Sequence, residues 1–158
     1  MRAPFQILAI PYRITNEKFL YCVFHRSDHD QWQFVAGGGE NNETPEQAAK
    51  REIFEESGVV AENVTPLTTM CYVTADCFSE KARANWSRDT YVIPEYSFAF
   101  ECSDNVVISR EHTEYAWLTY EETIARLKWD SNKTALYELD NRLIDKNLNN
   151  KGDKLCQL

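Results

Sequence analysis

The stretch from Gly37 to Val60 reads GGGENNETPEQAAKREIFEESGVV and carries the strongest local signals in the chain. Thr44 and Gln47 stand three residues apart and form a capping box, which marks the start of a helix. Gly58 is the kind of residue that stops a helix just past its last turn. We therefore predict a helix from Pro45 to Ser57. The three glycines that open the stretch predict close approach of another group or unusual backbone freedom.

Three acidic residues of this helix, Glu52, Glu55 and Glu56, are spaced i, i+3 and i+4 and therefore share one face. Their carboxylates repel one another, and they stand near the C-terminal end of the helix, where the helix dipole disfavours negative charge. A solvated helix face is one interpretation of such a cluster. The other is a site for Mg²⁺ or Mn²⁺, because these hard cations take carboxylate oxygens as ligands.

The residues around this helix form a longer pattern. It runs Gly37, five residues, Glu43, seven residues, then Arg51-Glu52-Ile53-Phe54-Glu55-Glu56-Ser57-Gly58-Val59. This resembles the Nudix box, the signature of the Nudix hydrolase superfamily, at all nine defined positions. The likeness extends roughly from residue 5 to residue 146. It includes Trp32-Gln33-Phe34 before the box, Glu111-His112 and Tyr115 to Leu118 after it, and Trp129-Asp130-Ser131-Asn132, which resembles the dihydroneopterin triphosphate diphosphatase branch.

The resemblance implies an α/β (α+β) domain of the Nudix fold, with a mixed sheet sandwiched between helices. It implies Mg²⁺, for which Mn²⁺ could substitute, and a hydrolase of a nucleoside diphosphate linked to another group. The implied metal ligands are Glu52, Glu55, Glu56, Glu111 and the Gly37 carbonyl. Arg51 would orient the carboxylates, and Glu43 would brace the loop or be simply exposed. Glu52 and Glu111 are both candidates for the catalytic base, and a solvated loop position is the equal alternative for Glu111.

Apolar runs outside the box predict further strands and helices. We expect a single domain over residues 1–148 and a flexible tail over residues 149–158. The predicted strands are 5–14 and 19–24 as a hairpin, 32–35, segments within 64–77 and 91–102, 106–108 and 115–118. The predicted helices are one capped by Thr119 and ending near Trp129, and one capped by Ser131 or Asn132 and ending near Leu148. Residues 79–90 are expected to form a loop or an irregular insertion.

Composition limits the partners. The 158 residues suit one domain, and 43% apolar residues suffice for a core. A net charge of −8 argues against a nucleic acid polymer or an anionic membrane as partner, and no run approaches the roughly 20 apolar residues of a membrane span. Five cysteines without a C-x-x-C pair predict a reduced protein without structural zinc. We expect a cytoplasmic monomer or homodimer.

Three residues are candidates for substrate contact. Trp32 offers a ring that could stack on a base, and Arg26 and Arg88 offer guanidinium groups suited to phosphate, although a core or surface role is at least as common for each. The expected substrate is a small nucleotide or pterin phosphate, cleaved by a Mg²⁺-dependent pyrophosphohydrolase acting on a nucleoside or pterin triphosphate. Dinucleoside polyphosphate hydrolysis is the alternative reaction. A non-catalytic nucleotide-binding module is a further alternative, against which the complete set of acidic residues argues.

Overall fold

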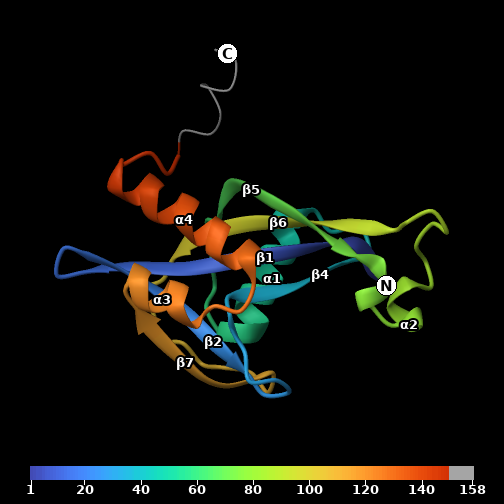
Figure 1. The fold of residues 1–158 in the computed structure, drawn as a ribbon, viewed down its shortest axis with the longest axis horizontal. Helices are drawn as coiled ribbons and strands as arrows, with labels where there is room; N and C mark the ends of the chain where they lie inside the picture. The colour runs from blue at the N-terminus through green and yellow to red at the C-terminus, as the bar shows by residue number, and fades with distance from the viewer. Residues whose placement is uncertain (150–158) are drawn as a thin grey trace, which may run out of the picture.

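The computed structural model describes residues 1–149, in which a seven-stranded mixed sheet lies between helices (Figure 1). The expected sandwich of sheet and helices is thereby confirmed. The elements are β1 (Arg2–Thr15), β2 (Lys18–Arg26), β3 (Trp32–Gln33), β4 (Val35–Glu40), α1 (Pro45–Ser57), β5 (Thr65–Thr74), the 3₁₀ turn Ala75–Cys77, α2 (Glu80–Arg83), β6 (Val92–Glu101), β7 (His112–Leu118), α3 (Tyr120–Arg126) and α4 (Asp130–Ile144).

The long strand β1 organises the sheet. Its first half pairs with β4 in antiparallel fashion, and its end forms the predicted hairpin with β2. On its other side β1 runs parallel to β6, which in turn pairs with β5. Strand β2 carries β7 and the short β3. This arrangement puts β4, which contains the three glycines that open the box, beside β1.

The two faces of β1 belong to two cores, because successive side chains of a strand point to opposite sides. Ile7 and Ala9 pack with Ala49 and Ile53 of α1 on one face. Leu8 and Ile10 belong to the core on the other face, to which α4 contributes its buried apolar side chains. In Figure 1, α4 crosses in front of the sheet and α1 lies behind it. Both faces of β1 are therefore buried.

Helix α1 begins and ends as its sequence predicts. The Thr44 side chain accepts from the Gln47 backbone N–H, and the Gln47 side chain accepts from the Thr44 N–H in return. Gly58 ends the helix with a φ of 70°, a left-handed conformation that glycine adopts without strain. These local contacts fix where the acidic face of α1 stands.

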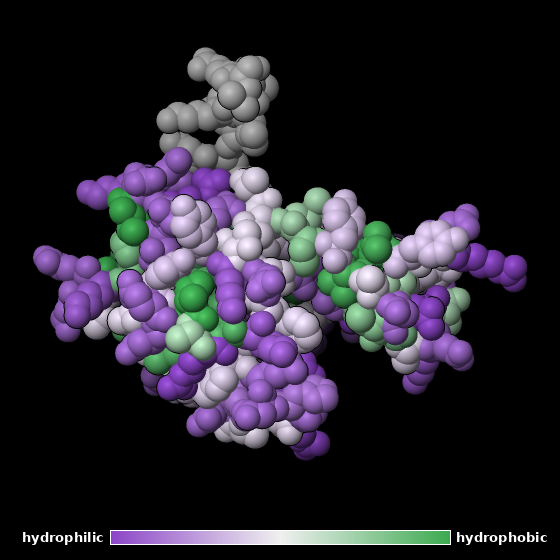
Figure 2. All heavy atoms as spheres, viewed as in Figure 1, coloured by the Kyte–Doolittle hydropathy of each residue, from purple (hydrophilic) through white to green (hydrophobic). Residues whose placement is uncertain are grey.

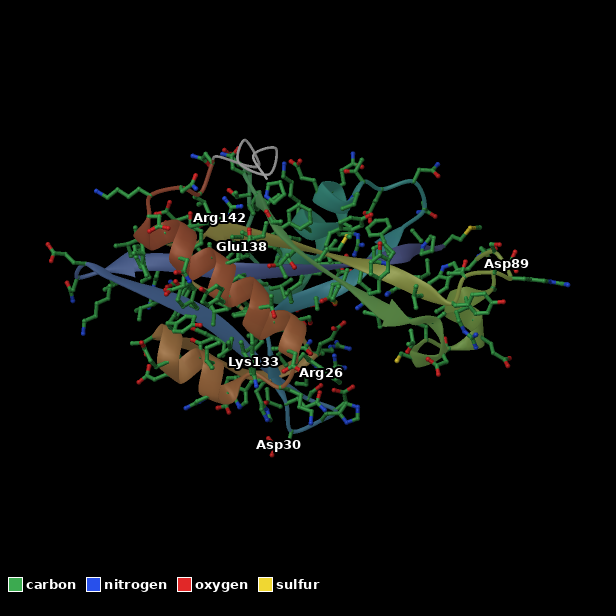
Figure 3. The ribbon with its side chains drawn as sticks, turned by 45° about the horizontal axis from the view of Figure 1, so that its top comes forward. Arg26, Asp30, Asp89, Lys133, Glu138 and Arg142 are labelled. Carbon is green, nitrogen blue, oxygen red and sulfur yellow. The ribbon has the colours of Figure 1, made fainter. Side chains whose placement is uncertain are left out.

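Helix α4 is fastened to β5 by one carboxylate. Between Pro66 and Met70 the pairing of β5 with β6 is irregular. There Glu138 of α4 accepts from the Thr68 and Thr69 backbone N–H groups, at 2.7 and 2.6 Å. Arg142 donates to Glu138 at 2.7 Å, one turn further along the helix (Figure 3). These bonds hold α4 across the sheet.

Three local predictions are wrong. Residues 106–108 form no strand, because the backbone there bonds to the end of α1: Val107 N donates to Ser57 O, and Ser109 N to Glu56 O. Helix α3 ends at Arg126 rather than near Trp129, since the next residue takes an extended conformation. The interval 79–90 is not only loop, because it contains α2.

The start and end of α4 also differ from prediction. Its N-cap is Trp129, without a side-chain hydrogen bond, and its last residue is Ile144 rather than Leu148. Asn132 does not cap the helix because its side chain turns inward, where Oδ1 accepts from the Phe34 backbone N–H at 3.1 Å. Apart from Asn149, the predicted tail lies outside the described residues.

The face seen in Figure 2 is largely hydrophilic, with apolar side chains confined to separate patches. Across residues 1–149, the helices are all too short or too polar to cross a membrane.

Candidate active site

The acidic face of α1 meets β4 at its glycines. A side chain on Gly37 would occupy the position of the Glu52 carboxylate, and one on Gly38 would meet the Arg2 guanidinium. Gly39 faces the Phe5 ring in the same way. Within residues 1–149, Gly58 has a positive φ, whereas Gly37, Gly38 and Gly39 do not. Close approach, rather than backbone freedom, is therefore why glycine stands here.

Arg51 links this strand to the acidic helix. Its guanidinium donates to both carboxylate oxygens of Glu43, at 2.8 and 3.0 Å, and to the Gly38 carbonyl at 2.8 Å. It also donates to Glu52 at 2.8 Å and Glu55 at 3.2 Å. Hydrogen bonds from Arg51 hold the pKa of Glu43 below its ordinary value. One guanidinium thus joins β4, the loop before α1 and the acidic face of α1.

Glu56 is the most buried member of the acidic face. It is 2% exposed, and its Oε2 has no hydrogen-bond partner within the described residues. Burial raises the pKa of Glu56 well above its ordinary value, and the charges of Glu52 and Glu111 raise it further. His112 Nε2 lies 3.7 Å from Glu56 Oε2. Burial lowers the pKa of His112 to about 4, so this imidazole is neutral near neutral pH.

Glu111 lies at the turn before β7, exposed, with its backbone carbonyl accepting from the Ser27 N–H. It is more than fifty residues from the box in sequence, yet its charge acts on both Glu52 and Glu56. Burial raises the pKa of Glu52, and Arg51 opposes this effect. The structure therefore brings Glu111 to the same region as the acidic face of α1.

The donor set fits a hard divalent cation. In residues 1–149 no three His, Cys, Asp or Glu side chains are already gathered as metal ligands. However, the Glu56 Oε2 atom is buried without a partner, and Gly37 leaves the Glu52 carboxylate beside a bare backbone. Carboxylate and carbonyl oxygens are the ligands that Mg²⁺ and Mn²⁺ take. A cation here would relieve the repulsion among Glu52, Glu56 and Glu111.

A cleft of about 500 Å³ opens next to these residues. Ala36 lines it, and the Ala36 backbone also hydrogen-bonds Glu56 and so opposes the rise of its pKa. Arg26 lines it too, and the charges of Glu111 and Glu56 act on the Arg26 guanidinium. The lining residues are Gln6, Arg26, His29, Gln31, Gln33, Ala36, Val73, Cys77, Phe78, Glu95, Trp129, Ser131 and Asn132.

The three candidate substrate residues have different positions. Arg26 lies in the cleft, where Asp28 accepts from it twice at 2.6 Å and leaves other guanidinium N–H groups unused. Trp32 is outside the lining, with its ring against Arg126 and His25. Arg88 is exposed in the loop before β6 and does not line the cleft. In Figure 3 its neighbour Asp89 lies at the right-hand end of the molecule, while Arg26 lies near the lower middle.

Sequence reasoning missed most of the cleft. Gln33, Glu95, Trp129 and Asn132 all line it. Glu95 carries a signal of its own, because it is a charged residue at an inward-facing position of β6. Gln33, Trp129 and Asn132 stand in segments that resemble Nudix proteins, but these segments are far apart in the sequence and nothing local connects them to one cleft.

Comparison with known proteins decides the family, since residues 7–139 match the NUDIX domain. The chain belongs to the Nudix family. A NUDIX hydrolase from Listeria monocytogenes str. 4b F2365 is 42% identical in its crystal structure, with a TM-score of 0.82 over 94% of this chain and 99% of that one. Dihydroneopterin triphosphate diphosphatase of Escherichia coli (strain K12) is 31% identical over 138 residues, 85% of this chain and 91% of the relative. An RNA pyrophosphohydrolase of Cereibacter sphaeroides (strain ATCC 17029 / ATH 2.4.9) is 31% identical over 147 residues, 82% and 88% of the two chains.

Membership of the Nudix family, together with these pyrophosphohydrolase relatives, makes the chain a hydrolase of phosphoric anhydride bonds. The resemblance seen in the box is thereby confirmed.

Proposed function

We propose that this Nudix hydrolase is a Mg²⁺-dependent pyrophosphohydrolase that cleaves within the phosphate chain of a small nucleoside or pterin triphosphate. The observation that carries the proposal is the position of Arg26, which lines the cleft while the charges of Glu56 and Glu111 act on it. One substrate could therefore place its ring in the cleft and its phosphates against the carboxylates. The similarity to a diphosphatase of dihydroneopterin triphosphate supports a triphosphate.

The metal would be held by Glu52, Glu55, Glu56, Glu111 and the Gly37 carbonyl, with Mn²⁺ able to replace Mg²⁺. When bound, it supplies positive charge to the phosphate chain and acidifies a water molecule. Such hydrolysis depends mainly on positioning and charge neutralisation.

The remaining tasks fall to side chains of this chain. Arg51 keeps the Glu52 carboxylate in place through its 2.8 Å hydrogen bond. Glu52 or Glu111 takes the proton from the attacking water. Arg26 binds a phosphate oxygen through the N–H groups that Asp28 leaves unused. His112 is only 5% exposed and packs against the Phe24 ring. It positions Glu56 and does not act as the base.

A substrate panel tests the proposal. Nucleoside triphosphates, dihydroneopterin triphosphate, a diadenosine polyphosphate, ADP-ribose, NADH and a 5′-triphosphate RNA are each incubated with Mg²⁺, with Mn²⁺ and with EDTA in ¹⁸O-labelled water. We expect metal-dependent release of pyrophosphate from a small triphosphate, with the label locating the attacked phosphorus. Faster hydrolysis of the RNA or of the dinucleotide would replace this substrate class, and equal rates in EDTA would overturn the metal requirement.

A further inference from the structure

The cleft contains a buried acid that the proposed chemistry does not use. Glu95 of β6 is 7% exposed and lines the cleft. Its Oε2 accepts from Gln6 Nε2 at 3.2 Å, and its Oε1 accepts from Cys71 Sγ at 3.5 Å. Both donors are neutral, and a thiol is a weak donor. A buried carboxylate requires good hydrogen bonds to offset its lost hydration, so these two leave it able to accept strong donors from a ligand.

The sheet places Glu95 away from the metal-binding carboxylates. Gly38 of β4, Gln6 of β1 and Glu95 of β6 are direct neighbours in one row across three strands. Gly38 and Glu95, the ends of this row, are therefore two strand spacings apart, a distance of about 10 Å. Gly38 stands at the end where Arg51 and the acidic helix meet the sheet. The cleft therefore has an acceptor at its Glu95 end and the Arg26 cation towards the carboxylates.

This polarity selects the orientation of a ligand. Phosphate oxygens are repelled by Glu95 and attracted to Arg26, so a triphosphate enters with its uncharged ring towards Glu95. Amide groups of Gln33 and Asn132 line the same space. Asn132 Oδ1 accepts from the Phe34 N–H, and Asn132 Nδ2 donates one N–H to Ser131 Oγ at 3.3 Å, which leaves its second N–H to donate to a ligand. The ring end of the cleft thus offers one carboxylate acceptor and amide donors.

Resting on the proposed function, we propose that Glu95 determines base specificity and selects a ring with the 2-amino-4-oxo edge that guanine and pterin share. That edge presents a ring N–H next to an exocyclic amine, so two donors can meet the two oxygens of one carboxylate. Adenine presents an amine next to an unprotonated ring nitrogen, whose lone pair would face a carboxylate oxygen. Hypoxanthine keeps the ring N–H but lacks the 2-amino group.

The test compares kcat/KM for GTP, ITP, ATP and dihydroneopterin triphosphate between the wild-type protein and Glu95→Gln. A bidentate contact of this kind discriminates by about 5- to 150-fold, so we expect the wild type to prefer GTP and dihydroneopterin triphosphate over ATP by at least about fivefold. Glu95→Gln replaces one acceptor by a donor. It should therefore lower kcat/KM for GTP at least about tenfold and leave kcat/KM for ATP unchanged or raised, because the new amide N–H can meet the unprotonated ring nitrogen of adenine.

Controls separate this inference from the proposed function. Glu101→Gln makes the same chemical change at an exposed position of β6 and should leave the GTP to ATP ratio unchanged. Equilibrium binding of the α,β-methylene analogues of GTP and ATP, which cannot be cleaved between the α and β phosphorus atoms, reports base preference even if neither nucleotide is hydrolysed. The two 2-amino-4-oxo substrates are ranked by their own kcat/KM values. Equal losses for GTP and ATP in a folded Glu95→Gln protein, or equal binding of the two analogues by the wild type, would overturn the role of Glu95.

Discussion

Glu56 and His112 face each other in the interior, with Nε2 of the imidazole 3.7 Å from Oε2 of the carboxylate. Neither of these atoms, nor His112 Nδ1, has a hydrogen-bond partner within the described residues. Burial favours the neutral form of both groups, so it raises the pKa of Glu56 above its ordinary 4.5 and lowers that of His112 from 6.5 to about 4. Folding therefore shifts both groups towards their neutral forms, protonated Glu56 and unprotonated His112.

In the metal-free protein, the two groups of this pair should give the free energy of unfolding opposite dependences on pH. The raised pKa of Glu56 means that the folded chain keeps this proton after the unfolded chain has begun to release it near pH 4.5, so the stability that Glu56 contributes is lost as the pH rises through its folded pKa. The lowered pKa of His112 means that the unfolded chain takes up a proton near pH 6.5 and the folded chain only near pH 4, so the stability that His112 contributes is lost as the pH falls across that range.

Urea unfolding in EDTA across this pH range measures the effect as a difference between wild type and Glu56→Gln. The variant cannot ionise at this position, so it should lack the decline that Glu56 causes and should become more stable relative to the wild type as the pH rises. A wild-type curve parallel to that of Glu56→Gln would mean that Glu56 titrates normally.

Gly37→Ala should disable the site, because the added Cβ would occupy the position of the Glu52 carboxylate. We expect kcat to fall at least about tenfold, because the displaced carboxylate is a proposed metal ligand. Gly38→Ala is the matched control, since its Cβ would meet the Arg2 guanidinium, which is not a proposed ligand. Equal kcat values for the two variants would contradict a specific role for Gly37.

The parts of the fold that could be predicted from sequence depend on local contacts. Helix α1 begins and ends as predicted because Thr44, Gln47 and Gly58 form its caps with their near neighbours. No strand forms at residues 106–108, because the backbone around Val107 hydrogen-bonds to the end of α1 instead of to another strand. Periodicity alone cannot reveal such a distant partner.

The same distinction holds for the site. Glu52, Glu55 and Glu56 were predictable because helical spacing and the Nudix box put them on one face. The cleft could not be predicted, since Glu95 of β6 and Asn132 of α4 are far apart in the sequence and line the same cleft only in the folded chain. Arg2 was also missed, because only the bare Gly38 backbone brings its guanidinium close to Glu52.

Metal binding should stabilise the protein, because a cation relieves repulsion among carboxylates in the native state alone. At a concentration 100 times its dissociation constant, a ligand adds about 2.7 kcal/mol. We expect Tm to rise with Mg²⁺ and Mn²⁺, and Glu56→Gln to reduce this rise. Glu62→Gln removes the same charge from an exposed position and should leave the rise unchanged. A wild-type Tm that neither cation moves would remove the support for a metal site.

Arg51→Lys should weaken both the fold and the chemistry, although it keeps the charge. An ammonium group cannot reproduce the two parallel bonds of Arg51 to Glu43 while also reaching Gly38 and Glu52. We expect a loss of about 1 to 3 kcal/mol in the free energy of unfolding and a fall in kcat of at least about tenfold. Adding Glu43→Gln to Arg51→Lys should cost less stability than Glu43→Gln alone. Strict additivity would show that the two residues act independently.

Glu111→Ala should depress kcat far more than Glu114→Ala under saturating Mg²⁺. Glu111 is exposed, as a solvated loop residue would be, but its charge acts on Glu52, on Glu56 and on Arg26. Glu114 follows three residues later on β7, where its backbone pairs with that of His25. The two substitutions remove the same group from neighbouring exposed positions, so only proximity to the reaction distinguishes them. Steady-state kinetics of both variants decides the question: equal, mild losses would place Glu111 in solvent and leave Glu52 as the remaining candidate for the base.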